Sequence, residues 1–181
     1  MNFLVDTNIL SEPTKPKPNP HVEKWIAEHE ADFYTSSVVM AELLNGLEKL
    51  PESGRKHRLA QQIEKLLEKL GGRTLSFNLR VAREWVRLQA QLRSKSRAMP
   101  WEDSIIAATA RHHGLTLATH NTSDFVHANV RLYARSPMAA ELEPNIPRKR
   151  NGPDERWISP ASPSSPPFWR ATDDLPGTAG A

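Results

Sequence analysis

Residues 3–10 read FLVDTNIL, and this stretch decides the fold because a short apolar run ends at an acid and a turn. The run of residues 2–5 is too short for a helix and is typical of a strand buried in a parallel sheet. Asp6 would then lie at the carboxyl end of that strand. We expect Thr7 to cap a short helical turn that ends before Pro13.

Outward from this stretch, the chain alternates between helical and strand patterns up to about residue 135. Caps, prolines and apolar spacing predict helices over residues 20–30, 37–50, 55–70, from 78 onward, and 100–113. Short apolar runs predict strands within residues 32–37, 73–77 and 115–119, with 129–133 as a candidate fifth strand. Helices that alternate with strands predict an α/β fold with a mainly parallel sheet covered on both faces.

The chain changes composition at about residue 135. Residues 136–181 hold nine of the 15 prolines in the 181-residue chain. We therefore expect residues 1–135 to form one domain and residues 136–181 to be a disordered Pro/Ser-rich tail. The whole chain carries 24 Lys and Arg against 21 Asp and Glu, a net charge of +3.

The residue types that are missing exclude several classes of protein. Cysteine is absent, which excludes disulfides, cysteine-ligated zinc, iron–sulfur clusters and a thiolate nucleophile. The N-terminal segment lacks the basic region of a signal peptide, and no apolar run approaches the roughly 20 residues of a membrane helix. We therefore expect a cytoplasmic protein that does not interact with a membrane.

Two acids in the first half of the domain are candidates for chemistry. Asp6 follows the first strand, where an acid in a simple turn is an equally good interpretation. On its helix Glu42 has Val38, Val39 and Gly46 as neighbours, so its carboxylate faces protein. A carboxylate in that position needs a cation, a donor or a proton, and a buried ion pair with an arginine is one alternative.

Two further acids lie in the second half of the domain. Asp103 shares a helix face with Ile106, so we expect Asp103 to point inward and Glu102 to point away. Both acids also suit the positive end of the helix dipole. Asp124 follows the strand predicted within residues 115–119, although it also matches the third-position acid of a helix cap formed by Asn121.

All four carboxylates can converge at one edge of the sheet, where the carboxyl ends of parallel strands meet. Clustered carboxylates raise one another's pKa, and a hard divalent cation such as Mg²⁺ or Mn²⁺ removes this penalty. Water activated by such an ion can attack a phosphodiester, which predicts products with 5′-phosphate ends. Because this chemistry does not use the ribose 2′-hydroxyl, it leaves DNA open as a substrate beside RNA.

Four sequence blocks resemble those of the PIN domain: FLVDTNIL, MAELLNGL around Glu42, WEDSIIAATA around Asp103 and LATHNTSDF around Asp124. More narrowly, residues 1–135 resemble the VapC- and FitB-type toxins of bacterial toxin–antitoxin pairs. The resemblance implies a three-layer α/β/α sandwich with Mg²⁺- or Mn²⁺-dependent endoribonuclease activity. It also implies inhibition by a small antitoxin protein and homodimerisation.

The resemblance extends to individual residues. Asp6, Glu42 and Asp103 match the three firm acidic positions of the family as catalytic residues and metal ligands, and Asp124 is our choice for the fourth. Residues beside them that could orient Asp6 or contact the substrate are Thr7, Asn8, His120 and Asn121. His120 stands where many relatives have an arginine.

Basic and apolar residues outside the four blocks add two expectations. Arg97 lies just ahead of the helix that carries Asp103 and is a candidate phosphate contact. The helices around residues 19–50 carry more apolar positions than one sheet face needs, which predicts a groove for an antitoxin helix. Trp85 and Trp101 are expected in the core.

Two other classes of protein remain open. An aspartyl phosphatase of the haloacid dehalogenase type also begins with a strand that ends in Asp. That chemistry requires a second Asp two residues later, where this chain has Asn8. The other alternative is a catalytically inactive PIN-like module that only binds RNA or a partner, and the presence of all four acids argues against it.

Overall fold

The computed structural model describes residues 1–133, so the tail predicted over residues 136–181 lies outside the described residues. Four parallel strands form one sheet in the order β3–β2–β1–β4. Their bounds are β1 Phe3–Val5, β2 Phe33–Ser36, β3 Thr74–Leu75 and β4 Thr116–Ala118. The central strand β1 is buried along its whole length. The prediction of an α/β fold with a parallel sheet is confirmed.

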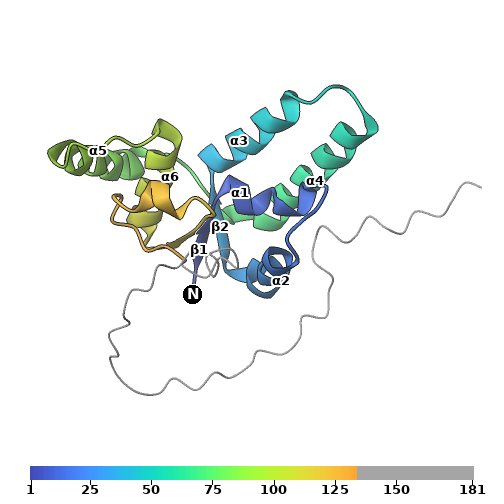
Figure 1. The fold of residues 1–181 in the computed structure, drawn as a ribbon, viewed down its shortest axis with the longest axis horizontal. Helices are drawn as coiled ribbons and strands as arrows, with labels where there is room; N and C mark the ends of the chain where they lie inside the picture. Colours follow the sequence, from blue (N-terminus) through green and yellow to red (C-terminus); the bar gives the residue numbers. More distant parts are fainter. Residues whose placement is uncertain (134–181) are drawn as a thin grey trace, which may run out of the picture.

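Helices cover the sheet on two sides. They are α1 Thr7–Leu10, α2 Pro20–His29, α3 Ser37–Glu48, α4 Gly54–Leu70, α5 Leu79–Ser94 and α6 Trp101–His113. Figure 1 shows α5 and α6 to the left of the strands and α2 and α4 to their right, which gives three layers. Within residues 1–133, no helix is both long and apolar enough to cross a membrane.

Local sequence signals set the ends of these helices. The side chain of Asn19 accepts a hydrogen bond at the start of α2, and Ser36 and Asn78 do the same for α3 and α5. These caps satisfy backbone N–H groups that the first helical turn leaves without partners. At the end of α6, Gly114 has a φ of 65°, the left-handed conformation that glycine adopts without steric cost.

The structure differs from the sequence predictions at three places. Asp6, not Thr7, caps α1, because the Asp6 carboxylate accepts the hydrogen bond from the Thr7 N–H. The candidate fifth strand is reduced to one parallel bridge between Leu117 and Leu132. Trp101 is 58% exposed because it begins α6, ahead of the turn that packs on α5.

The core packs around β1 and fixes its carboxyl end. Phe3 makes edge-to-face ring contacts with Trp25 and Tyr133, at centroid distances of 5.3 and 5.1 Å. On the other side of the sheet, Trp85 is partly buried and its indole N–H donates to the Ser104 hydroxyl of α6 at 2.8 Å. Asp6 therefore follows a strand that is held on both faces.

Candidate active site

Asp6 lies at the carboxyl edge of the sheet and is held by three donors. Its backbone N–H donates to the Ala118 carbonyl at 3.0 Å, which continues the pairing of β1 with β4. The carboxylate accepts hydrogen bonds from the Thr7 N–H at 2.7 Å, the Asn8 amide at 2.9 Å and the Thr119 hydroxyl at 2.6 Å. Burial raises the pKa of Asp6, and the three donors lower it only in part.

Asn8 and Thr119 connect the strand ends. The Asn8 amide donates to the Thr119 hydroxyl at 3.0 Å, and its carbonyl accepts the backbone N–H of His120 at 3.0 Å. The Thr119 hydroxyl also accepts the Asn121 N–H at 3.1 Å. Asn8 therefore orients Asp6 and the segment after β4, and its side chain is occupied by protein partners.

Sequence reasoning missed Thr119, although a signal was present. In the parallel register Val5 lies opposite Ala118, so the next residue on each strand, Asp6 and Thr119, emerge at the same edge. The signal is a hydroxyl residue that directly follows a strand, when the neighbouring strand ends in an acid. Finding it requires knowing that β1 and β4 are neighbours.

Glu42 lies on α3 and faces the segment that follows Asp6. The Thr7 hydroxyl donates to its Oε2 atom, and within residues 1–133 no arginine forms an ion pair with it. The alternative of a buried arginine pair is therefore not found within the described residues. Burial raises the pKa of Glu42, the Thr7 hydrogen bond lowers it, and the charges of Asp6 and Glu102 raise it further.

Asp103 is the most strongly perturbed acid of the site. Burial raises its pKa to about 6, and the negative charges of Asp6, Asp124, Glu42 and Glu102 contribute in that order. Within the described residues its carboxylate accepts no hydrogen bond that would oppose this. The structure thus brings Asp103 into electrostatic contact with the other three predicted acids.

Glu102 was expected to point away from the inward side of Asp103, and its exposed position, beside a partly buried Asp103, agrees with this expectation. Its side chain is exposed, yet its charge raises the pKa values of both Glu42 and Asp103. Glu102 therefore lies within electrostatic range of both acids. A fifth carboxylate thus adds to the negative charge around them.

The remaining predicted residues lie at the periphery. Asp124 is exposed in the turn η4 (Thr122–Phe125) and accepts a long hydrogen bond from the Ser123 hydroxyl at 3.4 Å. Asn121 occupies the N-cap position of η4 and Asp124 its first turn, as the cap interpretation predicts, but the Asn121 side chain makes no cap hydrogen bond. Arg97 is exposed in the turn after α5 and is not among the charges that shift the pKa values of the acids.

The donor set suits a hard divalent cation, although within residues 1–133 no three acids or histidines stand in an arrangement that already encloses a metal ion. Mg²⁺ retains several water ligands and needs only one or two carboxylates directly. Burial raises the pKa values of Asp6, Glu42 and Asp103, the charges of neighbouring acids raise those of Glu42 and Asp103 further, and a bound cation would offset both effects. The residues present therefore fit Mg²⁺ or Mn²⁺ by their chemistry.

An apolar pocket of about 280 Å³ opens beside Glu42. It lies between α1, α3 and α4 and includes Thr7 and Glu42 at its polar end. Most of its walls are aliphatic: Leu10, Pro13, Leu43, Leu47, Leu50, Leu59, Ile63 and Leu66. An apolar pocket thus lies along α3, where the groove was predicted, but α4 supplies one of its walls and α2 does not.

An acidic site at the carboxyl edge of a parallel sheet, flanked by helices on both sides, places the protein in a class of nuclease-like α/β domains. The profile of the PIN domain matches residues 3–130, and the chain belongs to the PIN-domain family. The resemblance noted from the four sequence blocks is confirmed.

Particular relatives narrow the comparison. The toxin FitB of Neisseria gonorrhoeae is 34% identical over 133 residues, which cover 72% of this chain and 96% of FitB. The VapC ribonuclease Y4jK of Sinorhizobium fredii is 36% identical over 130 residues, which cover 71% of this chain and 93% of the relative. The crystal structure of FitAcB from N. gonorrhoeae matches with a TM-score of 0.67 at 33% identity, over 72% of this chain and 96% of that one.

Proposed function

We propose that this chain is a Mg²⁺- or Mn²⁺-dependent endoribonuclease and the toxin of a toxin–antitoxin pair. The observation that carries the proposal is that Asp6, Glu42 and Asp103 gather beyond the end of β1 in a PIN domain, so that the charges of Asp6 and Glu42 raise the pKa of Asp103. The relatives named as the VapC ribonuclease Y4jK and the toxin FitB support RNA as the substrate and toxicity as the outcome.

The residues that would hold the ion are Asp6, Glu42 and Asp103, with Asp124 at the rim. A bound Mg²⁺ or Mn²⁺ would supply an acidified water molecule and would offset negative charge on the phosphate. The chain's own residues position these groups: Asn8 and Thr119 fix the orientation of Asp6. Preorganised ligands of this kind reduce the rearrangement that catalysis requires.

The other polar residues have separate tasks in this proposal. Thr7 holds the Glu42 carboxylate through its hydroxyl, so it acts on an acid rather than on RNA. His120 and Asn121, which follow Thr119 at the site edge, are the substrate contacts. Arg97 is a weaker candidate, because it lies apart from the acids in the turn after α5.

The partner in this proposal is a small antitoxin protein that inserts an apolar segment into the groove between α3 and α4. The aliphatic walls suit such a segment, and the groove ends at Glu42, so its occupant would reach the acids. The similarity to the FitAcB structure supports a partner protein of this kind. We further propose a homodimer acting in the cytoplasm, as the family resemblance implies.

The test is cleavage of end-labelled RNA and of a DNA of matched sequence by the full chain with Mn²⁺, Mg²⁺ or EDTA. Glu42→Gln is the site variant, and Glu28→Gln, an exposed acid on α2, is the matched control. We expect RNA cleavage that EDTA and Glu42→Gln abolish and that Glu28→Gln leaves intact. Equal activity of the two variants, or preferential cleavage of DNA, would contradict the proposal.

A further inference from the structure

An ion pair between the buried Glu12 and the half-exposed Lys15 lies within electrostatic range of His120, as Asp6 does, and has no part in the function proposed above. The Glu12 side chain is 5% exposed, which is unusual for a carboxylate. Its Oε2 atom accepts a hydrogen bond from the Lys15 ammonium at 2.6 Å, and its Oε1 atom accepts one from the Asn19 N–H at 2.9 Å. The sequence predictions assigned no role to either residue.

Glu12 remains charged despite its burial. Burial by itself raises the pKa of Glu12, but the hydrogen bonds from Lys15 and Asn19 and the Lys15 charge outweigh it and lower the pKa overall. A buried carboxylate with two donors holds its partner in a defined place. Lys15 is thus a fixed cation and not a freely moving surface lysine.

Lys15 is nevertheless accessible. Its side chain is 47% exposed, so part of the ammonium faces solvent. An ammonium group has three donors, and Glu12 takes one of them. The remaining donors can bind an anion from outside.

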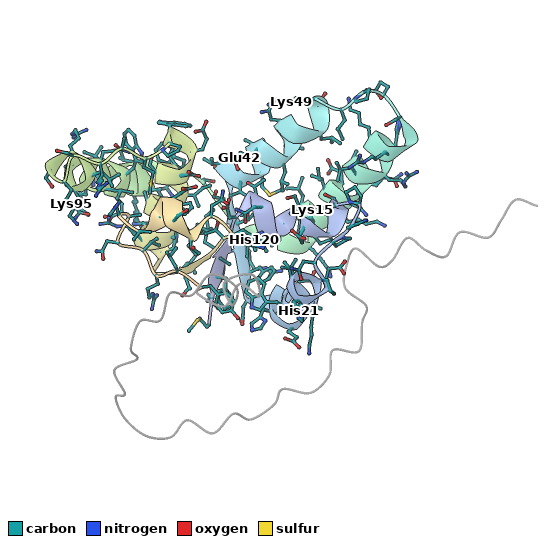
Figure 2. All side chains as sticks on the ribbon, viewed as in Figure 1. Lys15, His21, Glu42, Lys49, Lys95 and His120 are labelled. Atoms are coloured by element: carbon teal, nitrogen blue, oxygen red, sulfur yellow. The ribbon has the colours of Figure 1, made fainter. Side chains whose placement is uncertain are left out.

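His120 links this pair to the acid cluster. The imidazole responds to the charges of Glu12, Lys15 and Asp6, so it lies within electrostatic range of all three. Thr14, which precedes Lys15, lines the same pocket as Thr7 and Glu42. Figure 2 shows Lys15 and His120 in the central part of the molecule, around α1 and the strand ends, with Glu42 nearby on α3.

The acids at the site create a problem for an RNA strand. Asp6, Glu42 and Asp103, together with two exposed acids, repel phosphates, and a metal ion offsets this only at the scissile group. The phosphates beside it need cations supplied by the protein. Lys15 is held in place to supply one.

We propose that Lys15, positioned by Glu12, binds an RNA phosphate next to the scissile phosphate, on the His120 side of the site. This inference rests on the proposed ribonuclease function. A purely structural role is the competing explanation, in which Lys15 only neutralises Glu12. The two differ in one respect: a structural role changes stability, whereas phosphate binding changes the salt dependence of RNA affinity.

The experiment measures binding of a fluorescent single-stranded RNA to the full chain by anisotropy, at constant Mg²⁺ and between about 50 and 200 mM monovalent salt. All proteins in the binding assay carry Asp103→Asn to prevent cleavage, so Asp103→Asn alone is the reference for binding, and the wild-type protein is assayed separately for cleavage. The variants are Lys15→Gln, Lys15→Arg and Glu12→Gln. Lys24→Gln, an exposed lysine on α2 that pairs with Glu28, is the matched control.

We expect Lys15→Gln to weaken binding about 3- to 10-fold and to reduce the log–log salt slope by about 0.7, the value of one single-strand phosphate contact. Lys15→Arg should restore the slope, because it restores the charge. Glu12→Gln should weaken binding without changing the slope, because Lys15 keeps its charge but loses its anchor. Lys24→Gln should change neither quantity.

Two results would overturn the inference. The first leaves the proposed function standing, and the second contradicts the proposed function as well. If the wild-type protein cleaves RNA but adding Lys15→Gln to Asp103→Asn leaves the RNA affinity and the salt slope unchanged, the phosphate contact is wrong and the proposed function stands. If the wild-type protein does not cleave RNA and the Asp103→Asn protein does not bind it, both the phosphate contact and the proposed function are wrong. A lower melting temperature of Lys15→Gln and Glu12→Gln with unchanged RNA binding would establish the structural role instead.

Discussion

Replacing Asp103 by Asn is expected to stabilise the metal-free protein while it abolishes cleavage. Asp103 is partly buried, and the charges of four other carboxylates repel it. Within the described residues, no hydrogen bond to its carboxylate compensates for the burial or for the repulsion. Asn has nearly the same shape and carries no charge, so it removes both the desolvation cost and the repulsion. Functional sites commonly trade stability for activity in this way.

The size of the gain follows from the shift in pKa. The pKa of Asp103 rises from 3.8 to about 6, and one pKa unit corresponds to about 1.4 kcal/mol, which sets an upper limit of about 3 kcal/mol. Because the side chain is partly exposed, solvent screening reduces this to about 1 kcal/mol. For a domain of this size, that raises the melting temperature by about 4 °C.

The sign of the pH dependence is fixed by the same shift. A carboxyl group with a raised pKa in the folded state favours folding when it is protonated, and this contribution is lost as the pH rises through about 6. The wild-type protein should therefore lose stability relative to Asp103→Asn between about pH 4 and pH 6 and keep a constant deficit above that.

The assay is thermal unfolding in EDTA at pH 4, 5, 6, 7 and 8, followed by circular dichroism. Asp32→Asn, a partly exposed acid near the N-terminus and outside the site, is the matched control and should not show this pattern. The reasoning is refuted if Asp103→Asn is less stable than wild type at pH 8, or if its advantage is the same at pH 4 as at pH 8. Added Mg²⁺ should stabilise wild type more than the variant.

Three further predictions concern the supporting residues. Thr119→Val removes the hydroxyl that is bonded to Asp6 and should lower the cleavage rate about 10- to 100-fold in a kinetic assay. Thr109→Val is the control and should retain the cleavage rate, because the Thr109 hydroxyl donates only to the Ile105 carbonyl of its own helix. Gly46→Phe should fold normally, because a Cβ at Gly46 meets no atom within 4 Å, but should weaken antitoxin binding in calorimetry by filling the groove. EDTA should stop cleavage and Mn²⁺ restore it, with 5′-phosphate product ends by mass spectrometry; 2′,3′-cyclic phosphate ends would contradict the water mechanism.

The elements of the fold could be predicted because their signals are local. Asn19 before Pro20, Asn78 and Gly114 each mark a helix end within a few residues of chain, and the helix and strand bounds followed from them. Asp6 could be placed for the same reason, since it follows a buried strand directly. The inward face of Asp103 followed from helical spacing.

The contacts that complete the site could not be predicted, because they join distant segments. Thr119 reaches Asp6 across 113 residues of sequence, and that contact depends on the parallel register of β1 with β4. The role of Glu102 depends on the position of the first turn of α6 relative to α3. Glu12 lies in a proline-rich segment whose burial depends on packing at the start of α2, and no local pattern indicates it.

The acids of the site differ in how firmly they are held, and this difference has a chemical consequence. Asp6 is buried and bonded to three donors, Glu42 has the Thr7 hydroxyl, and within residues 1–133 the Asp103 carboxylate has no hydrogen-bond partner. Mg²⁺ demands near-ideal octahedral geometry, which a fully rigid set of ligands meets only if every position is correct. One fixed carboxylate and two that can adjust satisfy that demand more easily. The same lack of restraint leaves Asp103 exposed to the repulsion of its neighbours, so the acid best able to adapt to an ion is also the one that destabilises the protein most without it.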